Sequence, residues 1–334
     1  MDKNTKNFLI ICFCICLQIQ NVCLQIQTES FCECPLNDLS EDKLEHLAKD
    51  IVPYLLQGKT KGDAGKIGVI GGSIEYTGAP YFAAISALKV GADLVYVVTT
   101  ETAAPVIKSY SPDLIVYPYL NLKLASKISS LIQKMDVVVI GPGLGREDEA
   151  MTLTEDIIKT CKTMGKPLII DADGLYAVSK NPAIIKEYPS PGVIMTPNLR
   201  EAKKLQESIS RNDSNWYNFW GNYVSVLVKG QTDNFYSSVP LYNWSSSEGG
   251  TGRRAAGQGD IISGSLGTVF VWAFKYKNYC DNDSHEQLAQ SIATYSVAKF
   301  TRKCNSLAYE MYGRSMTASD MIGQIHVAFK DIFE

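Results

Sequence analysis

The chain has 334 residues, of which 46% are hydrophobic and 20% are charged, which is the balance of a soluble globular protein. This composition excludes a mostly disordered chain, a collagen-like repeat and a protein with many membrane spans. The net charge is −3, from 32 basic and 35 acidic residues, so we expect no general attraction to nucleic acid. With three histidines in the whole chain, no metal site built from histidine is expected.

The first 35 residues differ in composition from the rest of the chain. Lys3 and Lys6 precede an apolar run, Phe8 to Leu17, which suits a signal peptide and is too short to span a bilayer. We expect residues 1–35 to be a leader that is cleaved or disordered, with secretory or mitochondrial targeting and a misassigned first exon as the readings left open. Without targeting, the protein would be cytoplasmic. No stable membrane span is expected in the mature chain.

The cysteines are distributed unevenly. Six of the nine lie in this leader, and the other three, Cys161, Cys280 and Cys304, are far apart in the body of the chain. Such spacing offers no disulfide framework, so we expect the body to belong to a reducing compartment.

From about residue 36 the chain alternates between short apolar runs and helical stretches, which is typical of a parallel sheet covered by helices. A first helix is predicted after Ser40, a suitable N-cap. The predicted strands are Ile67–Ile70, Leu94–Val98, Leu114–Pro118, Val137–Ile140, Leu168–Ile170, Val193–Met195 and Val224–Val228. The helices predicted between them are Pro80–Val90, Ala103–Tyr110, Leu122–Lys134, Asp148–Thr163 and Asn198–Ser208.

The alternation of strands and helices changes after residue 228. Two polar strand-like runs, Asn234–Val239 and Leu241–Trp244, precede a glycine-rich turn, and two long helices at about 260–275 and 285–303 are predicted to close the chain. An eight-stranded barrel would repeat its unit of one strand and one helix to the end of the chain. We therefore predict a three-layer α/β/α fold with a doubly wound, mostly parallel sheet. Since no Pro/Ser/Gly-rich linker interrupts it, residues 36–334 are predicted to form one domain.

The segment from Glu248 to Asp260 carries the strongest chemical signal. It is rich in glycine and small residues, contains two arginines, and leads directly into an apolar helix. Small residues let a ligand approach the backbone, and a helix start presents free N–H groups to an anion. Asp260 would then lie beside a bound phosphate, placed to take a proton from a nucleophilic hydroxyl. A glycine-rich loop with Asp260 as an ordinary helix start is the alternative.

Other polar or glycine-rich segments follow predicted strands. They are 71–80, 141–146, 171–174, 196–201 and 229–233. The carboxyl ends of parallel strands meet at one edge of a sheet, where open α/β folds bind ligands. Each segment alone could be an ordinary turn, but their convergence predicts one long crevice.

These motifs, in this order, resemble a known family. Gly257–Asp260, opening a helix after a Gly/Arg loop, resembles the anion hole and catalytic aspartate of ribokinase-like folds. The full set is more specific, and it is similar to the ATP-dependent NAD(P)H-hydrate dehydratases of eukaryotes from about residue 40 to the end. The segments that carry this resemblance are 71–81, 108–116, 141–146, 171–175, 196–198, 229–230 and 257–260.

The resemblance implies a function and a set of site residues. The family dehydrates the S epimer of NADH or NADPH hydrated at the 6 position of the nicotinamide ring, with ATP as co-substrate and Mg²⁺ bridging its phosphates. Asp260 is implied to be catalytic. The implied contacts of the hydrated dinucleotide are Gly143, Gly145, Asn198, Leu199, Arg200, Glu201, Ala202, Lys203, Lys204 and Asp260. Those implied for ATP are Lys229, Gly230, Gln231, Thr232, Asp233, Gly250, Thr251, Gly252, Arg253, Arg254, Ala255, Ala256, Gly257, Gln258 and Gly259.

One residue departs from the family pattern. Where the family usually carries a bulky apolar residue after the glutamate of its Thr-Pro-Asn-x-x-Glu motif, this chain has Ala202, although Glu201 is kept. We therefore expect altered packing at this position and an unaltered role for Glu201.

Two other functions stay open at this point. A kinase of a small alcohol, such as a sugar or a vitamin precursor, would share the fold and release a phosphorylated product. A nucleotide-binding module without activity would turn over no ATP. ATP is preferred to ADP because the chain resembles the eukaryotic members. The sequence leaves the preference between the two hydrates and the formation of a homo-oligomer undetermined.

Overall fold

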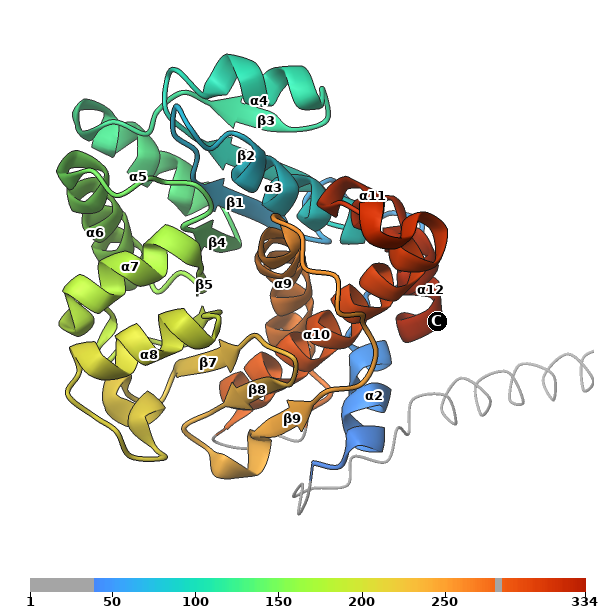
Figure 1. Ribbon diagram of the computed structural model, residues 1–334. Coiled ribbons are helices and arrows are strands. Elements are labelled where there is room, and N and C mark those ends of the chain that lie inside the picture. Colours follow the sequence, from blue (N-terminus) through green and yellow to red (C-terminus); the bar gives the residue numbers. More distant parts are fainter. Residues whose placement is uncertain (1–38, 280–283) are drawn as a thin grey trace, which may run out of the picture. The chain divides into compact units, whose positions relative to one another are not determined.

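The computed structural model describes residues 39–279 and 284–334 (Figure 1). The predicted leader and Cys280 lie outside the described residues. Cys161 and Cys304 are buried and carry free thiols. No helix within residues 39–279 and 284–334 is both long and apolar enough to cross a membrane.

A nine-stranded sheet lies at the centre of the described part, in the order β3-β2-β1-β4-β5-β6-β7-β8-β9. Strands β1 to β7 pair in parallel, whereas β8 and β9 are antiparallel to their neighbours. The strand order reverses between β1 and β4, and this point of an open α/β sheet is where ligands bind. The strands are β1 (Lys66–Ile70), β2 (Leu94–Val98), β3 (Ile115–Tyr117), β4 (Val137–Ile140), β5 (Leu168–Ile170), β6 (Val193–Met195), β7 (Val224–Val228), β8 (Asp233–Tyr236) and β9 (Trp244–Ser246).

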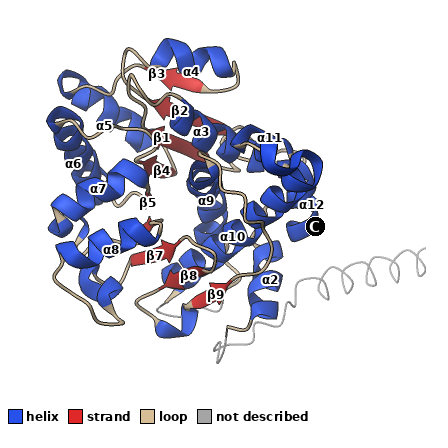
Figure 2. Cartoon of the chain, viewed as in Figure 1, coloured by secondary structure: helices blue, strands red, loops and turns tan. Residues whose placement is uncertain are grey.

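Helices cover both faces of this sheet (Figure 2). One layer is formed by α3 (Gly78–Val90), α9 (Gln258–Lys275) and α10 (His285–Tyr312), with α2 (Glu41–Asp50), α11 (Ala318–Gly323) and α12 (Ile325–Phe333) packed outside it. The opposite layer contains α5 (Ala125–Lys134), α6 (Asp148–Thr163), α7 (Ala172–Lys180) and α8 (Leu199–Ser208). Helix α4 (Ala104–Tyr110) packs near β3.

The α3–α9 contact fixes the position of α9 on the sheet. At Gly264 the two backbones come so close that an added Cβ would lie 1.9 Å from the carbonyl oxygen of Ala83. Only a glycine fits such an approach. The start of α9, which carries Asp260, is thereby fixed relative to α3 and the centre of the sheet.

The predicted fold class is confirmed, and each predicted parallel strand lies within two residues of an observed one. The predicted cap is also found, since the Ser40 hydroxyl accepts a hydrogen bond from the Lys43 amide at 3.4 Å. The predicted strand Leu241–Trp244 is wrong. Residues Pro240–Tyr242 form a 3₁₀ turn, because proline fixes φ and has no N–H for a ladder, and β9 begins only at Trp244.

The end of the chain also differs from the prediction. Helix α10 continues to Tyr312, and two further helices, α11 and α12, follow it. The sequence analysis also missed α7, which begins directly after Asp171. In the sequence, Gly174 is typical of a turn. In the structure, this glycine lies inside α7 and lets the helix pack against the carbonyl oxygen of Ile140.

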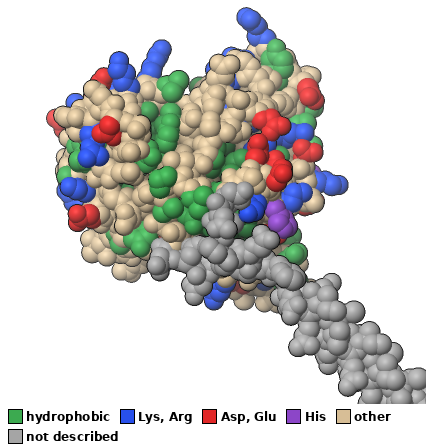
Figure 3. Space-filling view, turned by 90° about the horizontal axis from the view of Figure 1, so that it is seen from below, with side chains coloured by type: hydrophobic (Ala, Val, Ile, Leu, Met, Phe, Trp, Pro, Cys, Tyr) green, Lys and Arg blue, Asp and Glu red, His purple; other side chains and the backbone are tan. Residues whose placement is uncertain are grey.

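The surface seen from below carries charged side chains of both signs, interspersed with short bands of hydrophobic ones (Figure 3). This mixture agrees with the small net charge of the chain. Some apolar side chains are strongly exposed in the loop before β1, where Leu55 is 94% exposed.

Candidate active site

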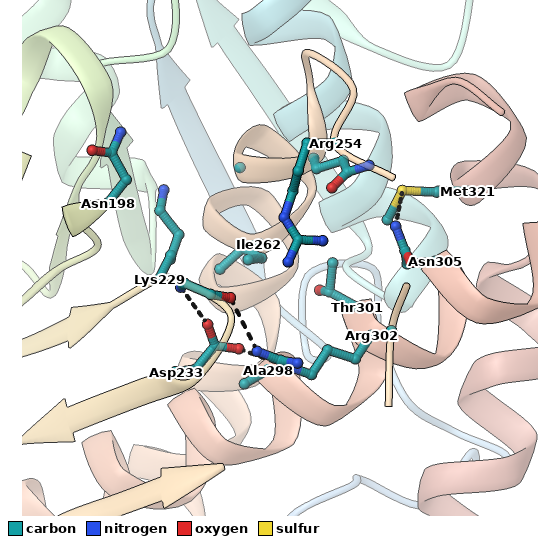
Figure 4. A pocket seen from close by; sticks show the side chains of 14 residues that line it. Asn198, Lys229, Asp233, Arg254, Ile262, Ala298, Thr301, Arg302, Asn305 and Met321 are labelled. Carbon is teal, nitrogen blue, oxygen red and sulfur yellow. Dashed lines mark hydrogen bonds and ion pairs between the residues drawn. The ribbon is translucent and has the colours of Figure 1, made fainter. Parts of the chain in front are cut away.

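The carboxyl ends of β6 and β7 and the start of α9 enclose a cavity of about 300 Å³ (Figure 4). Its lining comes from the turn after β7, the glycine-rich segment before α9, and α10. The residues are Asn198, Lys229, Gly230, Asp233, Gly250, Arg254, Gln258, Gly259, Ile262, Ala298, Thr301, Arg302, Asn305 and Met321. The predicted crevice therefore exists at the predicted sheet edge.

The start of α9 has the properties of an anion-binding site. Gly257 is the N-cap residue, with a left-handed φ of 93°, and within the described residues no side chain caps the free N–H groups of the first turn. An added Cβ at Gly257 would lie 2.7 Å from the Cβ of Ala318, so both the conformation and the space require glycine here. These N–H groups and the helix dipole remain available to a phosphate.

A buried ion pair lies beside this helix start. Lys229 Nζ is 2.7 Å from Asp171 Oδ1, and the two side chains are 14% and 3% exposed. Burial lowers the pKa of Lys229, but the neighbouring carboxylates outweigh this, Asp171 foremost, and the net shift is upward. The ammonium is also close to the helix start, because an added Cβ at Gly259 would lie 3.2 Å from Nζ. Lys229 thus stays charged where phosphate would bind.

Asp260 lies in the first turn of α9 and has an unusual proton affinity. Burial, and next the Asp171 carboxylate, raise its pKa to about 8, although the Lys229 ammonium acts in the opposite direction. A carboxyl group with a pKa near the working pH can both take up and release a proton, as a general base requires. The predicted catalytic role of Asp260 is consistent with this environment.

Helix α10 holds the glycine-rich segment in place. The Asn305 amide oxygen accepts hydrogen bonds from the Thr251 amide at 2.7 Å and from the Thr251 hydroxyl at 2.8 Å. The Ser306 hydroxyl accepts one from the Gly250 amide at 3.0 Å. A loop rich in glycine would lose much entropy on ordering, so these contacts fix what its sequence leaves free.

Arg302, one turn earlier on α10, joins the two loops of the cavity. Its Nε donates to Asp233 Oδ2 at 2.8 Å, and its two terminal nitrogens donate to the carbonyl oxygens of Gly230, Gln231 and Gly249. Asp233 in turn accepts a hydrogen bond from the Gly230 amide at 2.8 Å. The rigid guanidinium thus ties the turn after β7 to the glycine-rich segment.

The two arginines of the glycine-rich segment have different surroundings. Arg254 lines the cavity and also donates to the Thr251 carbonyl at 2.6 Å. Arg253 donates to the Arg254 carbonyl at 3.0 Å and does not line the cavity. Gln258 lines the cavity and donates to the Arg253 carbonyl. Arg254 is therefore the arginine of this segment placed to meet a phosphate.

The segment from Asn198 to Lys204 contributes mainly through its first residue. Asn198 lines the cavity and caps α8, and its side chain accepts from the amides of Arg200 and Glu201. Glu201 completes this capping box by accepting from the Asn198 amide at 2.9 Å. Burial raises the pKa of Glu201, with that hydrogen bond acting in the opposite direction. Ala202 is buried at 7% exposure.

The glycine loop after β4 lies at the strand-order reversal. Gly143 and Gly145 have positive φ angles of 64° and 82°. The Gly145 amide donates to Asp173 Oδ2 at 3.1 Å, and Arg146 pairs with the other oxygen of Asp173 at 2.8 Å. At Gly143 an added Cβ would lie 2.8 Å from Tyr76. Both predicted glycines therefore occupy positions that admit little else.

The structure brings part of the predicted set together. Seven of the residues implied for ATP line the cavity, as does Asn198 from the substrate set. Leu199 is 65% exposed, and Lys203 pairs with Glu207 on the outer surface of α8. Those implied for ATP but absent from the lining are Gln231, Thr232, Thr251, Gly252, Arg253, Ala255, Ala256 and Gly257.

The sequence analysis missed the contribution of α10. Arg302 and Asn305 were not among the predicted site residues, because they lie at and just beyond the end of the predicted helix 285–303, which carries no glycine-rich motif. A signal was present, however. Polar side chains recur at 299, 302 and 305, a helical spacing that places them on one face of the helix.

Comparison with solved structures shows the fold class of this chain. A hypothetical protein from Streptococcus mutans matches 89% of this chain and all of its own, with a TM-score of 0.71 at 20% identity. A ribokinase-like superfamily protein from Enterococcus faecalis matches 88% of this chain and 95% of its own, with a TM-score of 0.68 at 18% identity. The fold is ribokinase-like.

Sequence comparison identifies the family more narrowly. Residues 67–325 match the carbohydrate-kinase-type model described as NAD(P)H-hydrate dehydratase. Proteins named ATP-dependent (S)-NAD(P)H-hydrate dehydratase are similar over most of their length. The Aedes aegypti protein is 44% identical over 89% of this chain and 87% of its own length. The Homo sapiens protein is 40% identical over 86% of this chain and 84% of its own length. The chain belongs to the NAD(P)H-hydrate dehydratase family.

Proposed function

We propose that the protein catalyses the ATP-dependent dehydration of the S epimer of hydrated NADH and NADPH, restoring the reduced cofactors. Family membership and the names of the relatives support this activity. The observation that carries it in the structure is Asp260, a carboxyl of raised pKa in the first turn of α9, beside an uncapped helix start and the Lys229–Asp171 pair. This arrangement suits phosphoryl transfer with Asp260 as the base.

The chemistry requires activation of the leaving group, because hydroxide leaves poorly at neutral pH. Asp260 takes the proton of the ring hydroxyl while that oxygen attacks the γ-phosphorus of ATP, and ADP departs with the electrons of the broken P–O bond. The ring nitrogen lone pair then expels phosphate from the ring carbon. Loss of a proton from the adjacent carbon restores the ring double bond of NADH.

The residues of the site divide this work. The free N–H groups at the start of α9 and the Lys229 ammonium stabilise negative charge on the transferring phosphoryl group. Arg254 lies in the same cavity and adds a second cation. Arg302 and Asn305 line the cavity and hold its loops by hydrogen bonds, so we assign them as positioning residues.

Mg²⁺ fits this donor set as a partner of ATP. The nearby carboxylates already have partners or roles: Asp171 is paired with Lys229 and Asp233 with Arg302, Glu201 caps α8, and Asp260 serves as base. Few protein oxygens remain, so the ion would be held chiefly by nucleotide phosphates and water, as Mg²⁺ commonly is. When bound, it neutralises charge on the phosphates. A dehydratase from Bacillus subtilis with 18% identity and a TM-score of 0.62 was co-crystallised with ATP and Mg²⁺.

Product analysis tests this function against a small-alcohol kinase. With hydrated NADH and ATP, the wild-type protein is expected to release ADP, free phosphate and NADH in equal amounts. Asp260→Asn should retain ATP binding and lose turnover, since the amide cannot accept the proton. A stable phosphorylated product would contradict the dehydratase, and full activity of Asp260→Asn would contradict the role of Asp260.

A further inference from the structure

A second, larger cavity lies at the strand-order reversal, where the chain leaves β1, β2, β3 and β4. Its volume is about 700 Å³, within the usual range for small-molecule sites. We call it the switch-point pocket. It shares no lining residue with the cavity that carries Lys229 and Arg254. The reaction site described above therefore leaves it without a role.

The pocket combines an apolar interior with an acidic rim. Leu120, Leu144 and Leu153 offer flat apolar contact area, and Ile74 is 72% exposed at its edge. Its charged residues are Glu75, Glu101, Glu147, Glu149 and Lys123. Four carboxylates against one ammonium disfavour a phosphate group inside the pocket. Carboxylates accept hydrogen bonds, so they favour a ligand that donates them.

A buried polar group inside the pocket lacks a partner. Ser73 lines the pocket and is 7% exposed, and its hydroxyl makes no hydrogen bond within the described structure. Buried hydroxyls are normally satisfied, and each exception calls for an explanation. A rotation of the side chain that turns this hydroxyl toward a ligand in the pocket would supply one.

The pocket is within reach of the reaction site. The chain from Ser73 passes over Gly143, where Tyr76 and Ala79 lie against the glycine, and then enters α3. Phe82, less than one turn further along α3, lies against Gly257 at the start of α9. Three residues of helix correspond to a rise of about 5 Å. A dinucleotide is much longer than this interval.

We propose that the switch-point pocket binds the adenosine end of the hydrated dinucleotide, while the nicotinamide ring reaches Asp260. This inference rests on the proposed function. An adenine ring matches the leucine surfaces, and the ribose hydroxyls and exocyclic amine are donors that match the carboxylates. A carboxylate on ribose hydroxyls is a common device in dinucleotide sites of doubly wound folds. The phosphates of the substrate lie outside the pocket, toward the glycine loop after β4.

A cavity-filling variant tests the proposal. Ala150 lines the pocket from α6 and is half-buried, so Ala150→Trp places an indole inside it. Thr152→Trp is the matched control, because it places the same indole on the same helix at an exposed position that does not line the pocket. The two substrates compared are hydrated NADH and the hydrated reduced nicotinamide mononucleotide, which has no adenosine.

The expected result is specific to one substrate. Ala150→Trp should raise the KM for hydrated NADH by about tenfold or more. It should leave kcat, the KM for ATP and the KM for the hydrated mononucleotide near those of the wild type and of Thr152→Trp. Equal effects on both substrates, or no effect on hydrated NADH, would overturn the proposal.

A binding measurement separates this proposal from the proposed function. Calorimetry with ADP-ribose, in the presence of a saturating non-hydrolysable ATP analogue, should show binding to the wild type and to Thr152→Trp but not to Ala150→Trp. If no hydrated substrate is turned over but this pattern is found, the dehydratase assignment fails and the pocket stands. If dehydration proceeds and ADP-ribose binds all three proteins equally, the pocket assignment fails.

Discussion

Replacing Arg302 by methionine should damage both the stability and the ATP site. The substitution removes the contact with Asp233 and four donated hydrogen bonds to carbonyl oxygens of the two loops, those of Gly230 and Ser247 among them. The side chains of Arg302 and Asp233 are 13% and 6% exposed. Breaking such a buried pair costs about 3–5 kcal/mol, because the remaining carboxylate has no compensating charge. We expect a loss of this size together with a raised KM for ATP.

The neighbouring Lys303→Met is a matched control. Lys303 lies on the same helix and pairs with Asp331 at 2.8 Å, but the two side chains are 36% and 53% exposed. Exposed ion pairs contribute less than about 1 kcal/mol. Urea denaturation of the two variants should therefore differ by several-fold in the lost free energy of unfolding, and only Arg302→Met should change the KM for ATP.

A double variant identifies the cause of the loss. Asp233→Asn removes the orphaned charge but keeps an oxygen that can accept from the Gly230 amide. Added to Arg302→Met, it should recover part of the lost stability, which a double-mutant cycle reports as a favourable coupling. If Arg302→Met costs no more than Lys303→Met, or if Asp233→Asn only adds to the loss, the reasoning from the buried pair is refuted.

Three further predictions concern the site and its support. Because burial raises the pKa of Asp260 to about 8, the folded state keeps a proton that the unfolded state has released, so the free energy of unfolding should fall as pH rises from about 4 to 8. Asp260→Asn should remove this slope in urea titrations at several pH values, and an unchanged slope would contradict the shift. Lys229→Met leaves Asp171 buried without its cation, so calorimetry should show that ATP binding is lost. Urea denaturation should show that the free energy of unfolding falls by about 3–5 kcal/mol, and near-wild-type values in both measurements would contradict the role of the ion pair. Gly264→Ala should lower the melting temperature, because the added Cβ would meet a carbonyl oxygen of α3. Gly323→Ala should have little effect, because no heavy atom lies within 4 Å of a Cβ added there. Equal melting temperatures of the two variants would contradict the close packing at Gly264.

Much of the fold could be predicted because the parallel strands are buried on both faces. Runs such as Val137–Ile140 and Leu168–Ile170 are continuously apolar, and helices such as α5 and α6 show amphipathic spacing. The antiparallel edge was harder to predict. Strands β8 and β9 are short and partly polar, and the turn between them is set by Pro240 more than by any hydrophobic period.

The residues of the candidate site that lie in local sequence motifs could be predicted. Asp260 and the glycines of the segment before α9 form a compact sequence pattern at a helix start, and Lys229 follows a strand. Arg302 and Asn305 act on that segment from some 50 residues further along the chain, through contacts that depend on the packing of α10. The spacing of the polar residues 299, 302 and 305 indicates a shared helix face but not which segment that face contacts, so only the structure reveals these contacts.

The switch-point pocket illustrates the same limit. Its lining comes from four segments that are separated in sequence, and of its glutamates only Glu75 lies within a motif segment, 71–81. The sequence indicated a crevice at this sheet edge. The division of that crevice into a phosphate-binding cavity and an acidic pocket depends on how the loop over Gly143 is folded.

The most direct test of the central claim follows the near-ultraviolet absorbance of the reduced nicotinamide ring. The protein is mixed with an equal mixture of the two epimers of hydrated NADH, with ATP and Mg²⁺, and with each component left out in turn. We predict an absorbance rise that requires ATP and stops when the S epimer is consumed, with Asp260→Asn inactive under the same conditions. A folded, ATP-binding protein that produces no rise, or one that acts on both epimers without ATP, would contradict the account.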